Sequence, residues 1–119
     1  RRFLENRYLT VMEKFQSKDM KGGWFIGDFQ PSAHQTDEFE VAFMKHGKGQ
    51  FWEKHFHKKA TEITYIIKGK IKINDEIFSS GDIFKIKPNE IADPSFLEDS
   101  EIIVIKTPSD VNDKYVVQR

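Results

Sequence analysis

The sequence predicts an all-β domain, a barrel or sandwich with one short N-terminal helix. From residue 24 onward, short runs rich in Ile, Val, Phe, Tyr and Thr are separated by turn residues at intervals of about 8–12 residues, a spacing typical of sandwiches and barrels. The regular alternation of strands with helices that a parallel α/β sheet needs is missing from this pattern. We therefore expect antiparallel strands packed around one core.

Length and composition fit one such domain. The chain has 119 residues, of which 38% are hydrophobic and 13% aromatic. A chain of this size can bury a single core and leaves little for a second one. We expect a helical arm over residues 1–21 and a barrel over residues 22–119.

The first element is an amphipathic helix predicted over residues 3–16. Its apolar residues recur at helical spacing and would lie on one face. The pair Gly22 and Gly23 then ends the pattern. We expect the apolar face to pack on the barrel or on a second copy of the chain, and because this stripe exceeds what a small barrel needs, we predict a homodimer. The residues of the stripe are Leu4, Tyr8, Val11, Met12 and Phe15.

The β-region divides into short segments at its turn residues. Asn74-Asp75 predicts a tight hairpin between two of them. Gly69 and Gly81 fall at segment ends, where a positive φ is most easily adopted by glycine. Pro94 also falls near an end, where a missing N–H is tolerated. The predicted strands cover 24–29, 38–46, 50–57, 62–68, 70–73, 76–79, 82–87, 91–97, 100–107 and 113–117.

Three residues in the middle of the chain predict a metal site. His55 and His57 are two apart, so on a strand both project from one face. After four intervening residues Glu62 opens the next strand and can return a carboxylate beside them. Two imidazoles and one carboxylate suit Fe(II) with open coordination positions, and Zn, Mn or Ni could use the same ligands. The alternative is that two histidines flank a surface strand by chance.

The glycines around these residues favour the metal site. The stretch GQFWEKHFHKKATEITYIIKG, Gly49 to Gly69, closely resembles the first signature motif of the cupin superfamily. The resemblance spans residues of about 22–107 and implies a double-stranded β-helix, the jelly-roll barrel of cupins, with His55, His57 and Glu62 as metal ligands inside it.

The second cupin motif is degenerate. Gly81 begins it, but Ala92 stands at the position of the motif's histidine and Phe96 at that of its asparagine. The fourth ligand of the family is therefore absent. Asp93 is the candidate replacement, although strand parity turns it away unless a bulge beside Pro94 re-aims it.

Parity also predicts the cavity wall. Glu53 shares a face with His55 and is the candidate catalytic general base, unless it lies in water at the barrel mouth. His46 either lies at the cavity edge or has no part in it. The other residues expected to point inward are Phe51, Thr64, Ile66, Phe84 and Ile86, and Tyr65 is expected to point outward.

The resemblance implies a metal-dependent protein acting on a small anionic or carbohydrate-like molecule, as an isomerase, epimerase or oxygenase. A non-catalytic ligand-binding cupin is the alternative, favoured by the missing histidine of the second motif. The surrounding lysines are either a solvated surface or a zone that attracts an anionic substrate. These lysines are Lys45, Lys48, Lys54, Lys58 and Lys59.

Composition limits the other partners and the compartment. Nineteen basic and nineteen acidic residues balance to a formal net charge of zero, which argues against a nucleic-acid binder. The lack of cysteine excludes disulfides and thiolate ligands and is compatible with the cytoplasm, where we expect the protein. No apolar run approaches the roughly 18 residues of a membrane span, so we expect no membrane partner.

Overall fold

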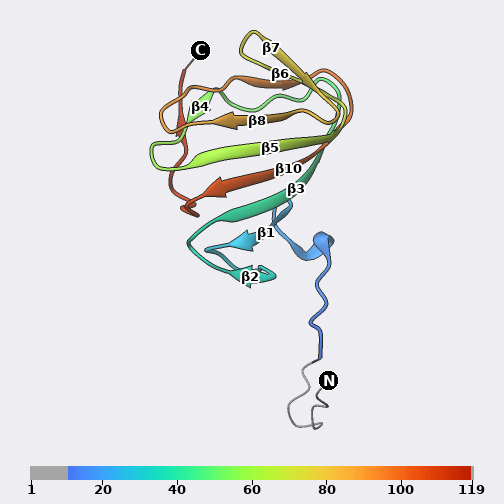
Figure 1. Cartoon of the computed structure of the whole chain (residues 1–119), viewed down its shortest axis with the longest axis vertical. Helices are drawn as coiled ribbons and strands as arrows, with labels where there is room; N and C mark the ends of the chain where they lie inside the picture. Colours follow the sequence, from blue (N-terminus) through green and yellow to red (C-terminus); the bar gives the residue numbers. More distant parts are fainter. Residues whose placement is uncertain (1–10, 119) are drawn as a thin grey trace, which may run out of the picture.

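A computed structural model describes residues 11–118, nearly all of whose regular structure is β. The larger sheet has six strands, and Figure 1 shows most of them one above another. Its order is β2 (His34–Gln35), β1 (Trp24–Gly27), β3 (Glu40–His46), β10 (Ser100–Thr107), β5 (Thr61–Lys68) and β8 (Ile83–Ile86). A three-stranded sheet has the order β7 (Glu76–Ser79), β6 (Lys70–Ile73) and β9 (Pro94–Phe96), and β4 (His55–Phe56) pairs with β11 (Tyr115–Val116).

The long central strands follow the predicted alternation. In β5, Glu62, Thr64 and Ile66 are buried, whereas Tyr65 and Ile67 are exposed. Successive side chains of a strand point to opposite faces, so the even positions form the inner layer. The inward prediction for Thr64 and Ile66 and the outward prediction for Tyr65 are confirmed.

The hairpin of β6 and β7 is also confirmed. Asn74 has a φ of 55°, in the left-handed region that asparagine tolerates better than most residues. The Asn74 side chain also contacts the segment that precedes β9. Asp93 N donates to Asn74 Oδ1 at 3.0 Å, and Asn74 Nδ2 donates to Ile91 O at 3.0 Å. The turn therefore ties β6 to the segment that precedes β9.

Gly69, the last glycine of the stretch that resembles the first cupin motif, lies at the sharp junction of β5 and β6. Its φ is 102°, and an added Cβ would collide with Ser100 on β10. Both the backbone conformation and the close approach of β10 exclude a larger residue. The junction lets the chain leave the large sheet and enter the small one within one residue.

The predicted strand over residues 50–57 is only partly regular, and β4 covers two of its residues. Trp52 N donates to Pro94 O at 3.2 Å, and His55 exchanges two hydrogen bonds with Ala92. Pro94 has no N–H to return to the ladder. Separate backbone hydrogen bonds, rather than a continuous ladder, therefore connect this segment to β9 and to the residues just before it.

The predicted N-terminal helix is wrong over residues 11–16, and the rest of it lies outside the described residues. Residues 11–16 leave the barrel as an extended segment (Figure 1), with Val11 91% and Met12 94% exposed. The helical structure is a single 3-10 turn, Ser17–Asp19. A short helix needs tertiary packing of its apolar face, which these side chains lack here.

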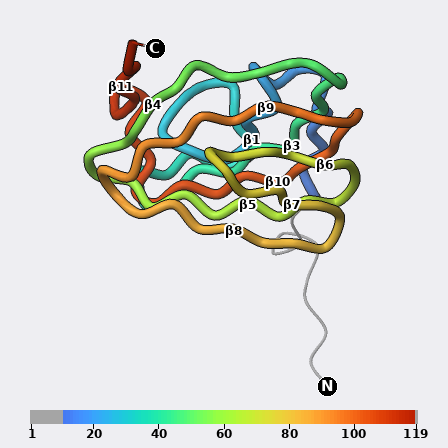
Figure 2. The backbone as a smooth tube through the Cα atoms, turned by 90° about the horizontal axis from the view of Figure 1, so that it is seen from above, coloured from blue at the N-terminus to red at the C-terminus, as the bar shows by residue number. Residues whose placement is uncertain are grey.

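The layers enclose one core, and from above the backbone closes around it (Figure 2). No helix in the described part of the chain has the length and apolarity to cross a membrane. The buried apolar residues come from both layers and are Ala42, Ile66, Ile71, Ile73, Ala92, Phe96, Ile102 and Val104.

Candidate metal centre

The turn between β4 and β5 presents the three predicted ligands. His55 is the first residue of β4, His57 is the first residue after β4, and Glu62 is the second residue of β5. All three are buried. The His55 and His57 ring centroids are 5.2 Å apart, and His57 Nε2 lies 3.9 Å from Glu62 Oε1. The structure thus brings the three predicted residues together.

Each imidazole is anchored by the ring nitrogen that points away from this meeting point. His55 Nδ1 lies 2.6 Å from Glu53 O, and His57 Nδ1 lies 2.7 Å from Asp113 O. A carbonyl oxygen can only accept, so in the neutral ring each Nδ1 carries the hydrogen and each Nε2 keeps its lone pair. This is the tautomer that an Nε2 metal ligand requires.

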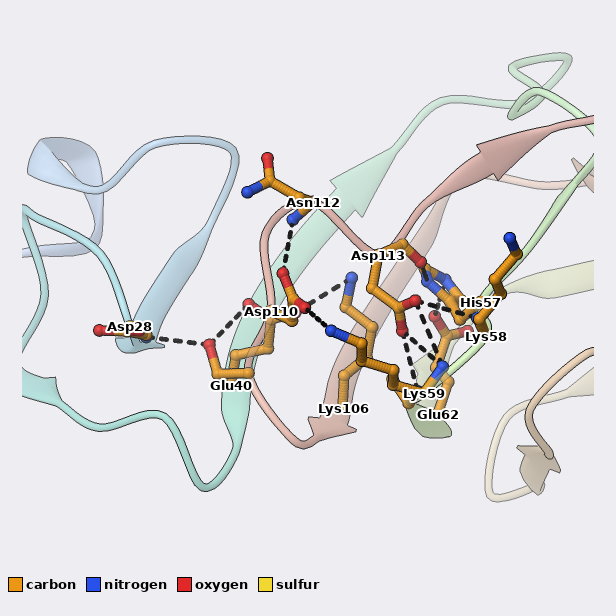
Figure 3. Close-up of polar contacts among 12 residues, drawn as sticks. Asp28, Glu40, His57, Lys58, Lys59, Glu62, Lys106, Asp110, Asn112 and Asp113 are labelled. Carbon is orange, nitrogen blue, oxygen red and sulfur yellow. Dashed lines mark hydrogen bonds and ion pairs between the residues drawn. The ribbon is translucent and has the colours of Figure 1, made fainter.

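Asp113 holds the turn itself, as Figure 3 shows. Its carboxylate accepts hydrogen bonds from the backbone N–H groups of Lys58, Lys59 and Ala60 at 2.9–3.2 Å. Burial raises the pKa of Asp113, but these hydrogen bonds outweigh burial and hold the pKa below its usual value. An ionised Asp113 therefore fixes the turn that places His57 and Glu62.

Burial moves the titrating groups of the centre toward their neutral forms. It lowers the pKa of His55 and His57, and the nearby Lys106 lowers that of His57 further. Burial also raises the pKa of Glu62, against the opposing effect of Lys106. Burial therefore disfavours the charged form of both groups that meet at 3.9 Å, His57 and Glu62.

The three residues open onto a cavity of about 440 Å³ inside the barrel. Its wall combines aromatic and aliphatic side chains with a few charged groups, which is the usual character of a small-molecule site. Larger open depressions lie around the Asn74–Asp75 turn, but none of the three ligands lines them. The cavity is lined by Gly22, Trp24, Met44, His46, Phe51, Trp52, Glu53, His55, His57, Glu62, Val104, Lys106 and Lys114.

The other predicted site residues are distributed differently. Glu53 lines the cavity but is exposed at its rim, and its carbonyl anchors His55. Asp93 lines the outer depression beside Asn74 and does not line the cavity. Its neighbour Ala92 is the buried residue, as strand parity requires.

Inward-pointing residues farther along the strands belong to the core rather than to the cavity. Thr64 and Ile66 are fully buried, and Phe84 and Ile86 are half-buried against the core. His46 does line the cavity, packed between Trp52 and Phe96. Both of its ring nitrogens are buried, and the Gln50 side chain opposes the lowering of its pKa by burial.

Sequence reasoning missed Asp113, Lys106 and Glu40. For Lys106 a signal exists, because it is in phase with the buried Ile102 and Val104 on one strand. Asp113 has no local signal, since its partners lie 53–55 residues earlier in the chain.

The donor set fits a divalent cation in kind, although the side chains as they stand do not enclose one. No group of three His, Asp or Glu side chains within the described part of the chain is drawn together closely enough to hold a metal ion. Two anchored imidazoles with free Nε2 lone pairs and a buried carboxylate are nevertheless the ligands that Fe, Zn, Mn and Ni share.

Comparison with known proteins identifies the fold. The sequence matches no protein-family model and no curated protein. Among solved structures, a PAC13 variant from Streptomyces with uridine has a TM-score of 0.66 at 16% identity, covering 91% of this chain and 92% of its own. An RmlC-like cupin from Ralstonia eutropha has a TM-score of 0.55 at 17% identity, covering 70% and 58%. Oxalate decarboxylase from Bacillus subtilis has a TM-score of 0.60 at 19% identity, covering 69% of this chain and 25% of its own.

Proposed function

Because the chain has the fold of a cupin domain, we propose that it binds a divalent metal ion through His55, His57 and Glu62 and acts on a small anionic or carbohydrate-like molecule in the adjoining cavity. Isomerisation, epimerisation and oxygenation are the reaction classes that this proposal covers. That oxalate decarboxylase has the same fold supports an enzymatic role without identifying the reaction.

The anchoring of the two imidazoles is the observation that carries the proposal. Both rings direct Nδ1 at a backbone carbonyl and Nε2 away from it, so anchoring of the rings does not use Nε2. Such outer hydrogen bonds orient metal-ligating histidines and raise their basicity. The burial of Glu62 beside His57 adds the carboxylate.

The residues of the chain divide the work of the site. A bound divalent ion supplies Lewis-acid polarisation of a substrate oxygen or lowers the pKa of a bound water. His55, His57 and Glu62 hold the ion, and the apolar wall formed by Trp24, Trp52 and Val104 excludes water from the ligand. Glu53 is the proposed general base, because it is a carboxylate residue that lines the cavity and is exposed to solvent.

A ligand-binding cupin without catalysis is the second candidate, and Ala92 favours it. Ala92 is buried and pairs directly with His55 on the neighbouring segment. The position that carries a histidine in the second cupin motif therefore has only a methyl group here. Only three protein ligands then remain. We expect weaker metal affinity than four ligands would provide.

Metal titration tests the proposal. We expect Zn²⁺, Ni²⁺, Mn²⁺ or anaerobic Fe²⁺ to raise the melting temperature of the wild type, since binding to the folded state stabilises it by about 2.7 kcal/mol at a hundredfold excess over Kd. His57→Ala is expected to abolish this shift. His34→Ala is the matched control, because His34 is exposed on β2 outside the cavity.

The same experiment can reject the site. Equal metal-induced stabilisation of the wild type and His57→Ala would place the ion elsewhere. Absence of stabilisation by all four ions would refute metal binding and favour the non-catalytic candidate.

A further inference from the structure

Three ionisable residues lie side by side across the inner face of the large sheet. Lys106 on β10 is paired in register with Glu40 on β3 and with Glu62 on β5. Residues directly opposite in neighbouring strands have Cβ atoms about 4.5–5.5 Å apart. Lys106 thus has a buried carboxylate on each side, at Glu40 and at Glu62.

Lys106 pairs with only one of them. Its Nζ lies 3.1 Å from Glu40 Oε1, and its side chain is 15% exposed. Ser109 Oγ donates to Glu40 Oε2 at 3.2 Å and accepts a hydrogen bond from Asp28 N at 2.9 Å, so a second contact fixes the Glu40 carboxylate. Lys106 is thereby held away from Glu62, whose carboxylate approaches His57 instead.

The ammonium group retains capacity for a ligand. It carries three N–H donors, and Glu40 is its one ion-pair partner among residues 11–118. It also lies 4.9 Å from the centroid of the Trp24 ring. Lys106 and Trp24 both line the cavity that contains His55, His57 and Glu62.

We propose that Lys106 binds the carboxylate of a small carboxylic-acid ligand in this cavity, and that Glu40 positions Lys106 for this task. The proposal rests on the proposed function and specifies its ligand class. Lys106 supplies the more buried of the two ammonium groups that line the cavity, since Lys114 is exposed at the rim. A single carboxylate needs only one such donor group, whereas the second charge of a phosphate dianion would lack a buried partner. Lys106 is a ligand-binding residue, and Glu40 acts through it.

Tryptophan fluorescence provides a direct assay. The two tryptophans of the chain, Trp24 and Trp52, both line the cavity. Glycolate is the probe, ethylene glycol is its uncharged analogue, and inorganic phosphate is the competing anion, all at matched ionic strength. We expect glycolate to change the emission at lower concentration than the other two.

Substitution at Lys106 separates the proposal from a general charge effect. Lys106→Met keeps the aliphatic chain and should weaken glycolate binding about tenfold or more, the usual worth of a charged hydrogen bond. Lys114→Met removes a cavity-lining lysine that is exposed at the rim, and should weaken binding by less than about threefold. Glu40→Gln/Lys106→Met removes both charges and guards against misfolding from an unpaired buried Glu40.

The role of Glu40 has its own readout. Glu40→Gln frees Lys106 to pair with Glu62, so Zn²⁺ affinity should fall although Glu40 is not a proposed metal ligand. In Glu40→Gln/Lys106→Met the competing cation is gone, and Zn²⁺ affinity should return toward that of the wild type. Unchanged Zn²⁺ affinity in Glu40→Gln would refute the positioning role.

The outcomes distinguish this proposal from the proposed metal site. Equal glycolate affinity in the wild type and Lys106→Met, or tighter binding of phosphate than of glycolate, overturns the carboxylate site. A wild type that binds no divalent ion overturns the metal site instead. In that case the glycolate titration of the metal-free protein still decides the assignment of Lys106.

Discussion

At the scale of single residues, the site is characterised by buried histidines whose pKa is lowered. Burial lowers the pKa of His46, His55 and His57. A histidine near its ordinary value of about 6.5 would compete for protons with a metal ion around neutral pH. The lowered values keep Nε2 of His55 and His57 available over a wider pH range.

This property predicts the pH dependence of stability in the metal-free protein. As the pH falls below about 6.5, the unfolded chain binds protons at these histidines before the folded protein does, so the free energy of unfolding decreases. The slope is at most about 1.4 kcal/mol per pH unit for each histidine. Glu62 acts in the opposite direction, because its raised pKa favours proton uptake by the folded state above its usual value of 4.5.

Urea unfolding in the presence of a chelator, between pH 7.5 and 5.5, measures this dependence. We expect His57→Gln to have a shallower slope than the wild type. His34→Gln should retain the wild-type slope, because His34 is exposed. Equal slopes in the wild type and His57→Gln would contradict the burial of His57 as a neutral group.

Two turns show how differently elements can be stabilised. The β6–β7 turn is local: Ile73 and Glu76 pair across it, and Asn74 between them has the positive φ that the tight hairpin needs. The β4–β5 turn depends on Asp113, which lies far along the chain and accepts hydrogen bonds from three consecutive backbone N–H groups. Loss of that carboxylate would leave partly buried donors unsatisfied.

We therefore predict that Asp113→Ala lowers the free energy of unfolding by about 1–3 kcal/mol. Zn²⁺ affinity should also fall, because the same loop positions His57 through the Asp113 carbonyl. Asp110→Ala is the matched control in this loop: Asp110 pairs with the exposed Lys59 at the surface, so its loss should destabilise the protein much less than Asp113→Ala does. Equal destabilisation by the two substitutions in urea unfolding would show that Asp113 does not hold the turn.

On the scale of the whole molecule, the outer face of the large sheet is unusually apolar. Cross-strand pairing aligns its side chains in two rows across β3, β10, β5 and β8. Ile83 is 61% exposed and Tyr65 is 44% exposed. The first row is Phe43, Ile103, Tyr65 and Ile83, and the second is Val41, Ile105, Ile63 and Lys85.

The homodimer stays a prediction, and this face is the surface that we expect a second copy to cover. A continuous apolar surface over four strands exceeds what monomers usually expose, and a two-fold axis would pair it with itself. Val11 and Met12 on the exposed arm add further apolar surface to such an interface. We expect a sedimentation mass of twice 14.0 kDa.

Charged substitutions on opposite sides of the barrel test this interface. Tyr65→Lys/Ile83→Lys should give the monomer mass without loss of the folded state. Ile77→Lys, on the exposed strand β7, should leave the dimer intact. A monomeric wild type at high protein concentration would refute the prediction.

Local patterns in the sequence determined the features that depend on neighbouring residues. Alternation placed Thr64 and Ile66 inward, Asn74 marked the hairpin, and the spacing of His55 and His57 put two imidazoles on one face. Each depends on strand geometry, which repeats every two residues and is visible in any short stretch.

Tertiary structure alone decided the contacts between distant segments. The pairing of Lys106 with Glu40 rather than with Glu62, the hold of Asp113 on the β4–β5 turn, and the placement of Asp93 outside the cavity all depend on which strands become neighbours. The extended course of residues 11–16 likewise depends on the absence of a packed surface beneath them and not on their helical pattern. Desolvation and long-range hydrogen bonding determine these outcomes, and neither leaves a periodic signal in the sequence.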